Sequence, residues 1–397
     1  MKVLHVITGL GIGGAEQQLR LLLGKLPTDS AVVTLTNPGA VARGITADGF
    51  PVTDLGIRGN RDLGALPRLT RLIRDGRYDL VHTHLYRACV YGRLAARLAG
   101  VRTVVATEHS LGAGQIEGRP LTVGARALYL GSERLGTATV AVSTTVAHRL
   151  RRWGVHRDRI HVVPNGIDVP RFAHDETARQ KARAELGLPV DAFVVGGVGR
   201  LSAGKRFDTL VRAVAALPAA RLLLVGEGPE RDRLRSLAAE LGAADRVLLH
   251  GACEDPPPKP GSGGDTGPDL PSLLAAMDLL VSTSGDEAFG LAVVEGLAAG
   301  LPVLYVTCPA LTDLPADAAP GARRISGTAT DLVAELTTFQ KQFTAGGGSH
   351  RLPVPPAARH YDISRSAEQL MSVYDHALRR NGGAPQRPVR RPATPEE

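Results

Sequence analysis

Two acidic residues in the second half of the chain are placed to bind a ligand that carries both phosphate and hydroxyl groups. Glu287 and Glu295 lie on either side of Phe289, Gly290 and Leu291, where an apolar helical pattern begins. The first backbone amides of a helix have no partner within the helix, and together with the helix dipole they attract anions. Carboxylates accept strong hydrogen bonds from hydroxyl groups. An anion site between two carboxylates therefore fits a nucleotide-sugar.

The sequence around these residues predicts a parallel α/β sheet. An apolar run over residues 277–282 predicts a buried strand, Gly300 marks the end of the helix, and residues 301–306 predict the next strand. Glu287 therefore lies in a strand-to-helix loop, and Glu295 lies about one turn inside the helix. In a parallel sheet such loops gather at the carboxyl ends of the strands, where ligands bind.

Two cations follow the first predicted strand of the same sheet. Residues 193–198 form an apolar run, and Arg200 and Lys205 come directly after it. Two cations on one loop can bind the phosphate groups of a ligand. The chain has no D-x-D pattern near this point, which favours metal-independent chemistry. The alternative is a pair of solvated surface cations.

Glycines after the first predicted strand offer a rival interpretation. Gly9, Gly11 and Gly14 match the G-x-G-x-x-G dinucleotide fingerprint. The fingerprint also needs an acidic residue at the end of the second strand to bind the ribose, but the chain has Asn37 and Pro38 there. An NAD(P)-dependent oxidoreductase is therefore the least favoured function. A tight turn, or a backbone that closely approaches a ligand, accounts for the glycines.

Composition limits the remaining classes. The chain has 397 residues, 43% of them hydrophobic, which is enough for two domains. Aromatic residues make up only 4%, which argues against nucleic acid as a partner despite the formal charge of +8. The three cysteines show no metal-ligand spacing, and no apolar run is long enough for a signal peptide or a membrane span. We therefore expect a cytoplasmic protein.

Strands followed by single helices occur twice along the chain, once from residue 3 and again from residue 193. A polar, charged stretch over residues 169–189 separates the two halves and is predicted to be a linker. This alternation predicts two Rossmann-like, doubly wound parallel sheets that face one another across a cleft. A Pro- and Gly-rich loop over residues 252–272 is either a lid or an inert insertion. We predict an acceptor-side domain over residues 1–168, a nucleotide-sugar domain over residues 169–356, a C-terminal helix over residues 357–380 that returns to the first domain, and a disordered tail over residues 381–397.

Five short motifs stand in the order found in one enzyme family. They are Gly13 to Glu16, Glu108 with His109, Asn165 to Asp168, Gly199 to Lys205, and the Glu-x7-Glu pattern of Glu287 and Glu295. With these motifs the chain resembles the retaining nucleotide-sugar glycosyltransferases of family 4, which have the GT-B fold, and in particular those of bacterial cell-surface or exopolysaccharide synthesis. Three features depart from the family pattern. Arg206 and Gly296 stand where the family usually has glycine and alanine, and residues 307–312 replace a Gly-rich loop that often borders the donor phosphates in the family.

The resemblance assigns roles to individual residues. It implies that Glu295 binds the ribose of the donor, Glu287 the transferred sugar, and that His109 lies near the reacting carbon. His82 and His84 end the preceding predicted strand, and at most they are expected to line the cleft. It implies catalytic roles for Glu287, His109, Arg200 and Lys205, and donor contacts from Gly13, Gly14, Arg200, Lys205, Glu287, Phe289, Gly290, Leu291 and Glu295. It also implies a UDP- or GDP-linked sugar as co-substrate, no cofactor and no metal. Because no residue stands out as a nucleophile, we expect the acceptor's proton to pass to the departing phosphate.

The acceptor is less defined, and three possibilities stay open: a glycan, a lipid-linked molecule or a small molecule. A basic segment spans residues 58–77, and its arginines are Arg58, Arg61, Arg68, Arg71, Arg74 and Arg77. Such a helix either lies on an anionic membrane, which would make the protein peripheral on the inner face of the plasma membrane, or packs as an ordinary helix with a basic outer face. A GT-B enzyme that converts nucleotide-sugars, or a degenerate nucleotide-sugar-binding protein, is the alternative function.

Overall fold

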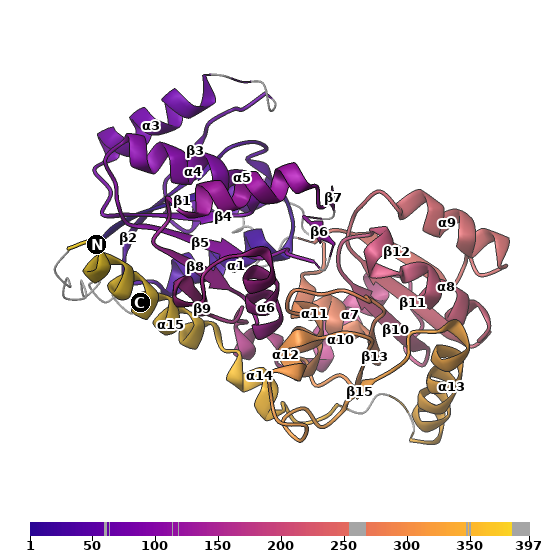
Figure 1. Cartoon of the computed structure of the whole chain (residues 1–397). Helices are drawn as coiled ribbons and strands as arrows, with labels where there is room; N and C mark the ends of the chain where they lie inside the picture. Colours follow the sequence, from indigo (N-terminus) through magenta and orange to yellow (C-terminus); the bar gives the residue numbers. More distant parts are fainter. Residues whose placement is uncertain are drawn as a thin grey trace. The chain divides into compact units, whose positions relative to one another are not determined.

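A computed structural model describes residues 1–58, 62, 64–112, 114–117, 119–253, 267–346, 348 and 351–382. The chain divides into two compact units (Figure 1). Unit 1 consists of Met1–Gly166 together with the chain from Ile363 onwards, and unit 2 consists of Ile167–Asp362. Each unit contains one parallel sheet, which confirms the predicted fold class of two parallel α/β domains.

Unit 1 contains a seven-stranded parallel sheet in the order β3-β2-β1-β4-β5-β8-β9. Its strands are β1 (Lys2–Ile7), β2 (Asp29–Thr34), β3 (Val52–Asp54), β4 (Leu80–His84), β5 (Val104–Glu108), β8 (Ala138–Ala141) and β9 (Ile160–Val162). Its helices are α1 (Gly14–Lys25), α2 (Gly39–Ala47), α3 (Ala65–Gly76), α4 (Tyr86–Leu98), α5 (Val123–Glu133), α6 (Thr144–Trp153) and α15 (Ile363–Arg380). A short hairpin of β6 (Gln115–Ile116) and β7 (Arg119–Pro120) follows β5.

Unit 2 contains a six-stranded parallel sheet in the order β12-β11-β10-β13-β14-β15. Its strands are β10 (Phe193–Val198), β11 (Ala220–Val225), β12 (Val247–Gly251), β13 (Leu279–Ser282), β14 (Val303–Tyr305) and β15 (Ala322–Arg324). Its helices are α7 (Glu176–Glu185), α8 (Phe207–Ala215), α9 (Arg231–Glu240), α10 (Leu270–Ala276), α11 (Leu291–Ala298), α12 (Pro309–Thr312), α13 (Ala329–Ala345) and α14 (Pro356–His360). Short 3₁₀ turns η2 (Val169–Phe172) and η3 (Ala203–Lys205) precede α7 and α8.

The last helix belongs to unit 1, as predicted. Leu370, Val373 and Tyr374 of α15 pack with Val3 and Leu80 of the sheet in one buried cluster. The predicted helix over residues 357–380 is wrong in one respect, because it is two helices that belong to different units. They separate at Tyr361, whose carbonyl accepts from the amide of Ile167 at 2.8 Å and whose hydroxyl donates to the carbonyl of Ala310 at 2.6 Å.

Helix α7 lies in a stretch that the sequence predicted to be a polar linker. Arg179 and Arg183 of this helix are buried, and both donate to the carboxylate of Asp278, at 2.6 and 2.8 Å. The amide of Val194 at the start of β10 donates to the same carboxylate at 2.8 Å. The linker prediction failed because two arginines occupy positions where a packed helix normally shows apolar residues.

Candidate functional site

In unit 2, the loops that follow β10 and β13 meet at a lysine–glutamate pair. Lys205, in η3, donates through Nζ to Oε1 of Glu287. Two further contacts join these loops: the hydroxyl of Thr283 donates to the carbonyl of Lys205 at 2.6 Å, and that of Ser284 to the carbonyl of Gly204 at 3.4 Å. A cation and a carboxylate predicted to serve the same ligand are therefore in direct contact at the carboxyl ends of adjacent strands.

The turn at Phe289 and Gly290 packs against the amino end of α12. Gly290 has φ of 102°, and a Cβ at this position would overlap Sγ of Cys308, so both conformation and space require glycine. The carbonyl of Phe289 accepts from the amide of Ala310 at 2.9 Å and from the Cys308 thiol at 3.6 Å. The Phe289 ring meets the ring of Tyr361 edge to face at 5.0 Å. The segment that replaces the family's Gly-rich loop therefore supports the turn.

Helix α11 begins at this turn without a side-chain cap. Its N-cap residue is Gly290, which has no side chain to accept from the first amides of the helix. Leu291 is the first helical residue, and Glu295 lies one turn further on and is partly buried. Gly296 packs so closely on Leu280 of β13 that a Cβ would overlap the leucine side chain. The departure from alanine at this position thus sets how closely α11 lies on the sheet.

Arg200 is placed differently from Lys205. Its side chain is exposed in the loop after β10, and within the described residues its guanidinium makes no hydrogen bond or ion pair. The next residue, Leu201, lies backbone against backbone with Gly228 in the loop after β11, so a Cβ on Gly228 would overlap the Leu201 carbonyl. The loop is therefore fixed in position, while the cation it carries extends into solvent.

In unit 1, the predicted donor glycines lie at the amino end of α1. Gly13 is the N-cap residue and has an extended backbone, and a Cβ there would overlap the carboxylate of Glu16. Gly14 begins the helix and is exposed. One turn later the Gln18 side chain spans the backbone of Gly166, donating to its carbonyl at 2.6 Å and accepting from its amide at 2.9 Å. This contact connects the glycine turn to Gly166, the last residue of unit 1 before the chain enters unit 2.

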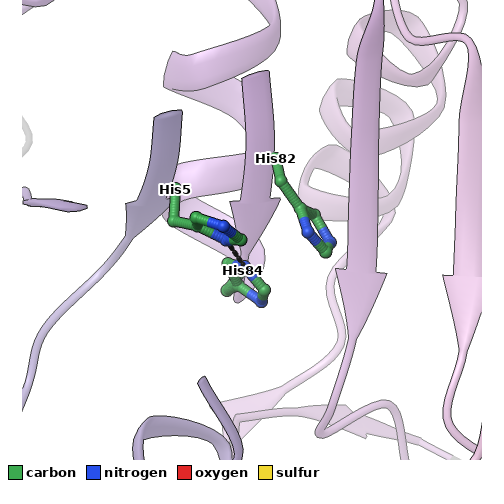
Figure 2. A group of neighbouring side chains, drawn as sticks. All are labelled: His5, His82 and His84. Carbon is green, nitrogen blue, oxygen red and sulfur yellow. Dashed lines mark hydrogen bonds between the residues drawn. The ribbon is translucent and has the colours of Figure 1, made fainter. Parts of the chain in front are cut away.

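His109 follows β5 directly and is 8% exposed. Its Nε2 lies 3.2 Å from Nδ1 of His84, and Nε2 of His84 lies 3.2 Å from Nδ1 of His5 (Figure 2 shows the second contact). Burial lowers the pKa of His109 to about 4 and that of His5 to about 3, so both rings are neutral near neutral pH. The sequence assigned His82 and His84 to the lining of a cleft. That assignment is wrong, because both are fully buried in the sheet.

A second buried network positions the backbone before His109. The Tyr129 hydroxyl donates to Oε1 of Glu108 at 2.6 Å, and the Cys89 thiol lies 3.5 Å from the same oxygen. The Arg93 guanidinium lies 4.7 Å from the centre of the Tyr129 ring and donates to its hydroxyl at 3.3 Å. Burial raises the pKa of the Glu108 carboxyl. Sequence reasoning missed these partners because they come from α4 and α5 at no recognisable spacing.

Comparisons with known proteins identify the family. Residues 12–171 match the model described as Glycosyltransferase Family 4, and residues 178–342 match Glycosyl transferases group 1. A D-inositol 3-phosphate glycosyltransferase from Mycobacteroides abscessus is 32% identical over 382 residues, which are 91% of this chain and 80% of that protein. The chain belongs to glycosyltransferase family 4.

Other relatives agree with this assignment. The D-inositol 3-phosphate glycosyltransferase of Acidothermus cellulolyticus is 32% identical over 72% of this chain, which spans 65% of that relative's length. Among solved structures, Anabaena Alr3699/HepE in complex with UDP and glucose matches with a TM-score of 0.79 and 22% identity, over 94% of this chain and 99% of that one. The likeness extends through both units, as expected for the GT-B fold of family 4.

The basic segment of this family 4 chain folds as a packed helix. Leu69 and Ile73 of α3 are buried in the core of unit 1, and Arg68 pairs with Asp62 at 2.7 Å. Arg58, Arg71, Arg74 and Arg77 are exposed, and Arg61 lies outside the described residues. The structure therefore favours the ordinary packed helix with a basic outer face. No helix in the described part of the chain is long and apolar enough to cross a bilayer.

Two further predictions fall wholly or partly outside the described residues. Most of the predicted loop over residues 252–272 has no description, and the part that has one includes α10. The tail beyond Gly382 is not described either. The grouping of unit 2 residues with His109, Gly13 and Gly14 in one site stays a prediction, because the positions of the two units relative to one another are not determined.

Proposed function

We propose that this family 4 protein transfers a sugar from a nucleoside-diphosphate-sugar to a hydroxyl of an acceptor, with retention of configuration and without a metal. The observation that carries the proposal is the contact between Lys205 and Glu287 beside the uncapped amino end of α11. This arrangement offers a cation and helix amides for phosphate, and a carboxylate for sugar hydroxyls, within one pair of loops.

In this proposal the donor separates the pair. The diphosphate binds Lys205, Arg200 and the amides of α11, and Glu287 then accepts hydrogen bonds from the sugar. Glu295, one turn along the helix, accepts from the ribose. As the glycosidic bond breaks, the two cations stabilise charge on the leaving phosphate, which takes the acceptor's proton on the same face. The solved neighbour whose title names UDP and glucose supports UDP-glucose as the first donor to test.

The names of the relatives support a phosphorylated polyol as the first acceptor to test. Several relatives, including those from Mycobacteroides abscessus and Salinispora arenicola, are D-inositol 3-phosphate glycosyltransferases. The chain spans only 65% to 80% of the length of the relatives named here, so a glycan or lipid-linked acceptor belongs in the same panel. Product anomers resolved by proton NMR report whether configuration is retained.

Variants of the unit 2 residues test the proposal. Thermal shift with UDP-, GDP- and ADP-sugars identifies the donor, and transfer assays follow with Arg200→Ala and Lys205→Met. Losing either cation is expected to lower kcat by roughly a hundredfold or more. Glu295→Ala should weaken donor binding by about tenfold, the equivalent of one charge-assisted hydrogen bond.

Lys181→Met is the matched control, because Lys181 is exposed on α7 and, in the part of the chain that the structure describes, its one ion pair is with Glu185 at 3.9 Å. It should transfer sugar at the wild-type rate. Full activity in both Arg200→Ala and Lys205→Met would remove the cations from the mechanism, and failure to bind any of the three donors would contradict the proposed function itself.

A further inference from the structure

A row of three imidazoles runs through the core of unit 1 and ends at His109. His5 lies on β1 and His84 on β4, and the nitrogen contacts His5–His84 and His84–His109 are both 3.2 Å. Neighbouring rings are close to parallel, with centres 5.5 Å apart in both pairs. Each contact joins an Nδ1 to an Nε2, so the row has a direction.

His82 packs against His84 of this row and is itself held by two hydrogen bonds. Its ring centre lies 4.1 Å from that of His84, its Nδ1 meets the Tyr374 hydroxyl at 2.6 Å, and its Nε2 meets the Thr107 hydroxyl at 2.7 Å. Nitrogens of His5, His82 and His84 lie within 4.8 Å of one another, as in a metal site. Both nitrogens of His82 and of His84 already make hydrogen bonds, however, so a metal would have to break them. The row of hydrogen bonds is the better account.

A row of neutral imidazoles can hold its protons in only two ways. Each neutral ring has one N–H donor and one bare acceptor nitrogen. If His5 donates through Nδ1, His84 must also donate through Nδ1, and His109 carries its proton on Nδ1. In the opposite arrangement all three rings carry the proton on Nε2, and His109 presents a bare Nδ1.

The two ends of the row decide between these arrangements. Nε2 of His5 and Nδ1 of His109 are both buried, and among the described residues neither has a hydrogen-bond partner. The Nε2 arrangement leaves an N–H unpaired at His5, which is 0% exposed in the sheet. Unpaired buried N–H groups are rarer than under-used acceptors and cost about 1–3 kcal/mol. The Nδ1 arrangement moves that N–H to His109, which is 8% exposed and lies at the carboxyl end of β5, the end of a parallel sheet where ligands bind.

We propose that His5 and His84 are positioning residues that fix His109 as the Nδ1–H tautomer, so that His109 donates a hydrogen bond to an oxygen of a ligand bound at the carboxyl end of β5. His109 then acts as a donor and has no role as a general base. The identity of the accepting oxygen rests on the proposed function. The tautomer does not, because it follows from the buried row alone.

Ring-nitrogen NMR of the whole protein, labelled with ¹⁵N-histidine, tests the tautomer. Single variants His5→Gln, His84→Gln and His109→Gln assign the signals by subtraction. The expected result is a protonated Nδ1 and a bare Nε2 on all three rings at neutral pH. A protonated Nε2 on His109, or a metal bound stoichiometrically in elemental analysis of the purified protein, overturns the proposal.

Activity provides a second measurement. The amide nitrogen of asparagine can take the place of Nδ1, so His109→Asn should keep kcat/KM within about tenfold of wild type, whereas His109→Leu should lose roughly a hundredfold. Equal losses in both variants contradict a donor at Nδ1. If the wild-type protein transfers no sugar from any donor, the proposed function fails, and the NMR result still decides the tautomer.

Discussion

Mild acid should unfold unit 1 before unit 2. The perturbation is a change from about pH 7 to about pH 5.5, and it acts on four fully or nearly fully buried histidines: His5, His82, His84 and His109. Burial lowers the pKa of each, to about 3 for His5, to about 4 for His109, and well below the ordinary value for the other two. No histidine among the described residues of unit 2 is buried to this extent.

The direction in which the stability of unit 1 changes with pH follows from proton binding by its histidines. The unfolded chain binds protons at histidine below about pH 6.5, whereas the folded rings stay neutral until pH approaches their lowered pKa values. The contribution of these neutral buried histidines to the stability of unit 1 is therefore fully present above about pH 6.5, and it is lost as the pH falls towards 4 or 3. Each histidine loses about 1.2 kcal/mol between pH 7 and pH 5.5, so the four together remove about 5 kcal/mol. That is a large part of the stability of an ordinary domain.

Hydrogen exchange followed by mass spectrometry measures this loss in each unit, after correction for the pH dependence of intrinsic exchange. The strands β1 and β4 should lose about 5 kcal/mol of protection, while β10 and β11 serve as the internal reference. His82→Phe removes one proton-binding group and should reduce the loss by about 1.2 kcal/mol. The exposed His148→Gln should leave it unchanged. A loss in unit 1 within about 1 kcal/mol of that in unit 2 would refute the reasoning.

Two substitutions in unit 2 test its packing. Asp278→Asn leaves buried guanidinium groups without their carboxylate and should lower the unfolding free energy of unit 2 by about 3–5 kcal/mol, measured by urea denaturation. Asp232→Asn, in an exposed pair, should cost less than about 1 kcal/mol, and equal losses would contradict the explanation. Gly296→Ala should push α11 away from Leu280 and destabilise unit 2 by about 1–3 kcal/mol. Gly285→Ala, which meets open space, is the control, and a neutral Gly296→Ala would show that the packing yields easily.

The elements that carry regular patterns could be predicted from the sequence. The strand before Glu287 and the helix containing Glu295 both follow from apolar periodicity and from glycine stops. Helix α7 could not be predicted in this way, because Arg179 and Arg183 face inward and are neutralised by Asp278, a residue far away in the sequence. A pattern of apolar residues cannot reveal a helix whose core contacts are ionic.

The contacts within the candidate site were only partly predictable. The sequence predicted that Lys205 and Glu287 serve one ligand. Their direct pairing depends on β10 and β13 being neighbours in the sheet, and the order of strands cannot be predicted from local sequence. The role of His5 was missed altogether. In the sequence it is a polar residue inside an apolar strand, and only the register that pairs it with His82 brings it into the row that ends at His109.

The acid sensitivity of unit 1 and the proposed tautomer of His109 have the same origin. Apolar side chains at these sheet positions would pack in the core as well as imidazoles do, and they would not lower the unfolding free energy on acidification. Four buried histidines therefore lower stability in acid without any gain in packing. Residues that lower stability in this way are expected where a functional group needs support. Here the support is the order of protons along His5, His84 and His109, with His82 holding the rings in place. The cost in stability and the fixed donor at His109 are thus two consequences of one arrangement.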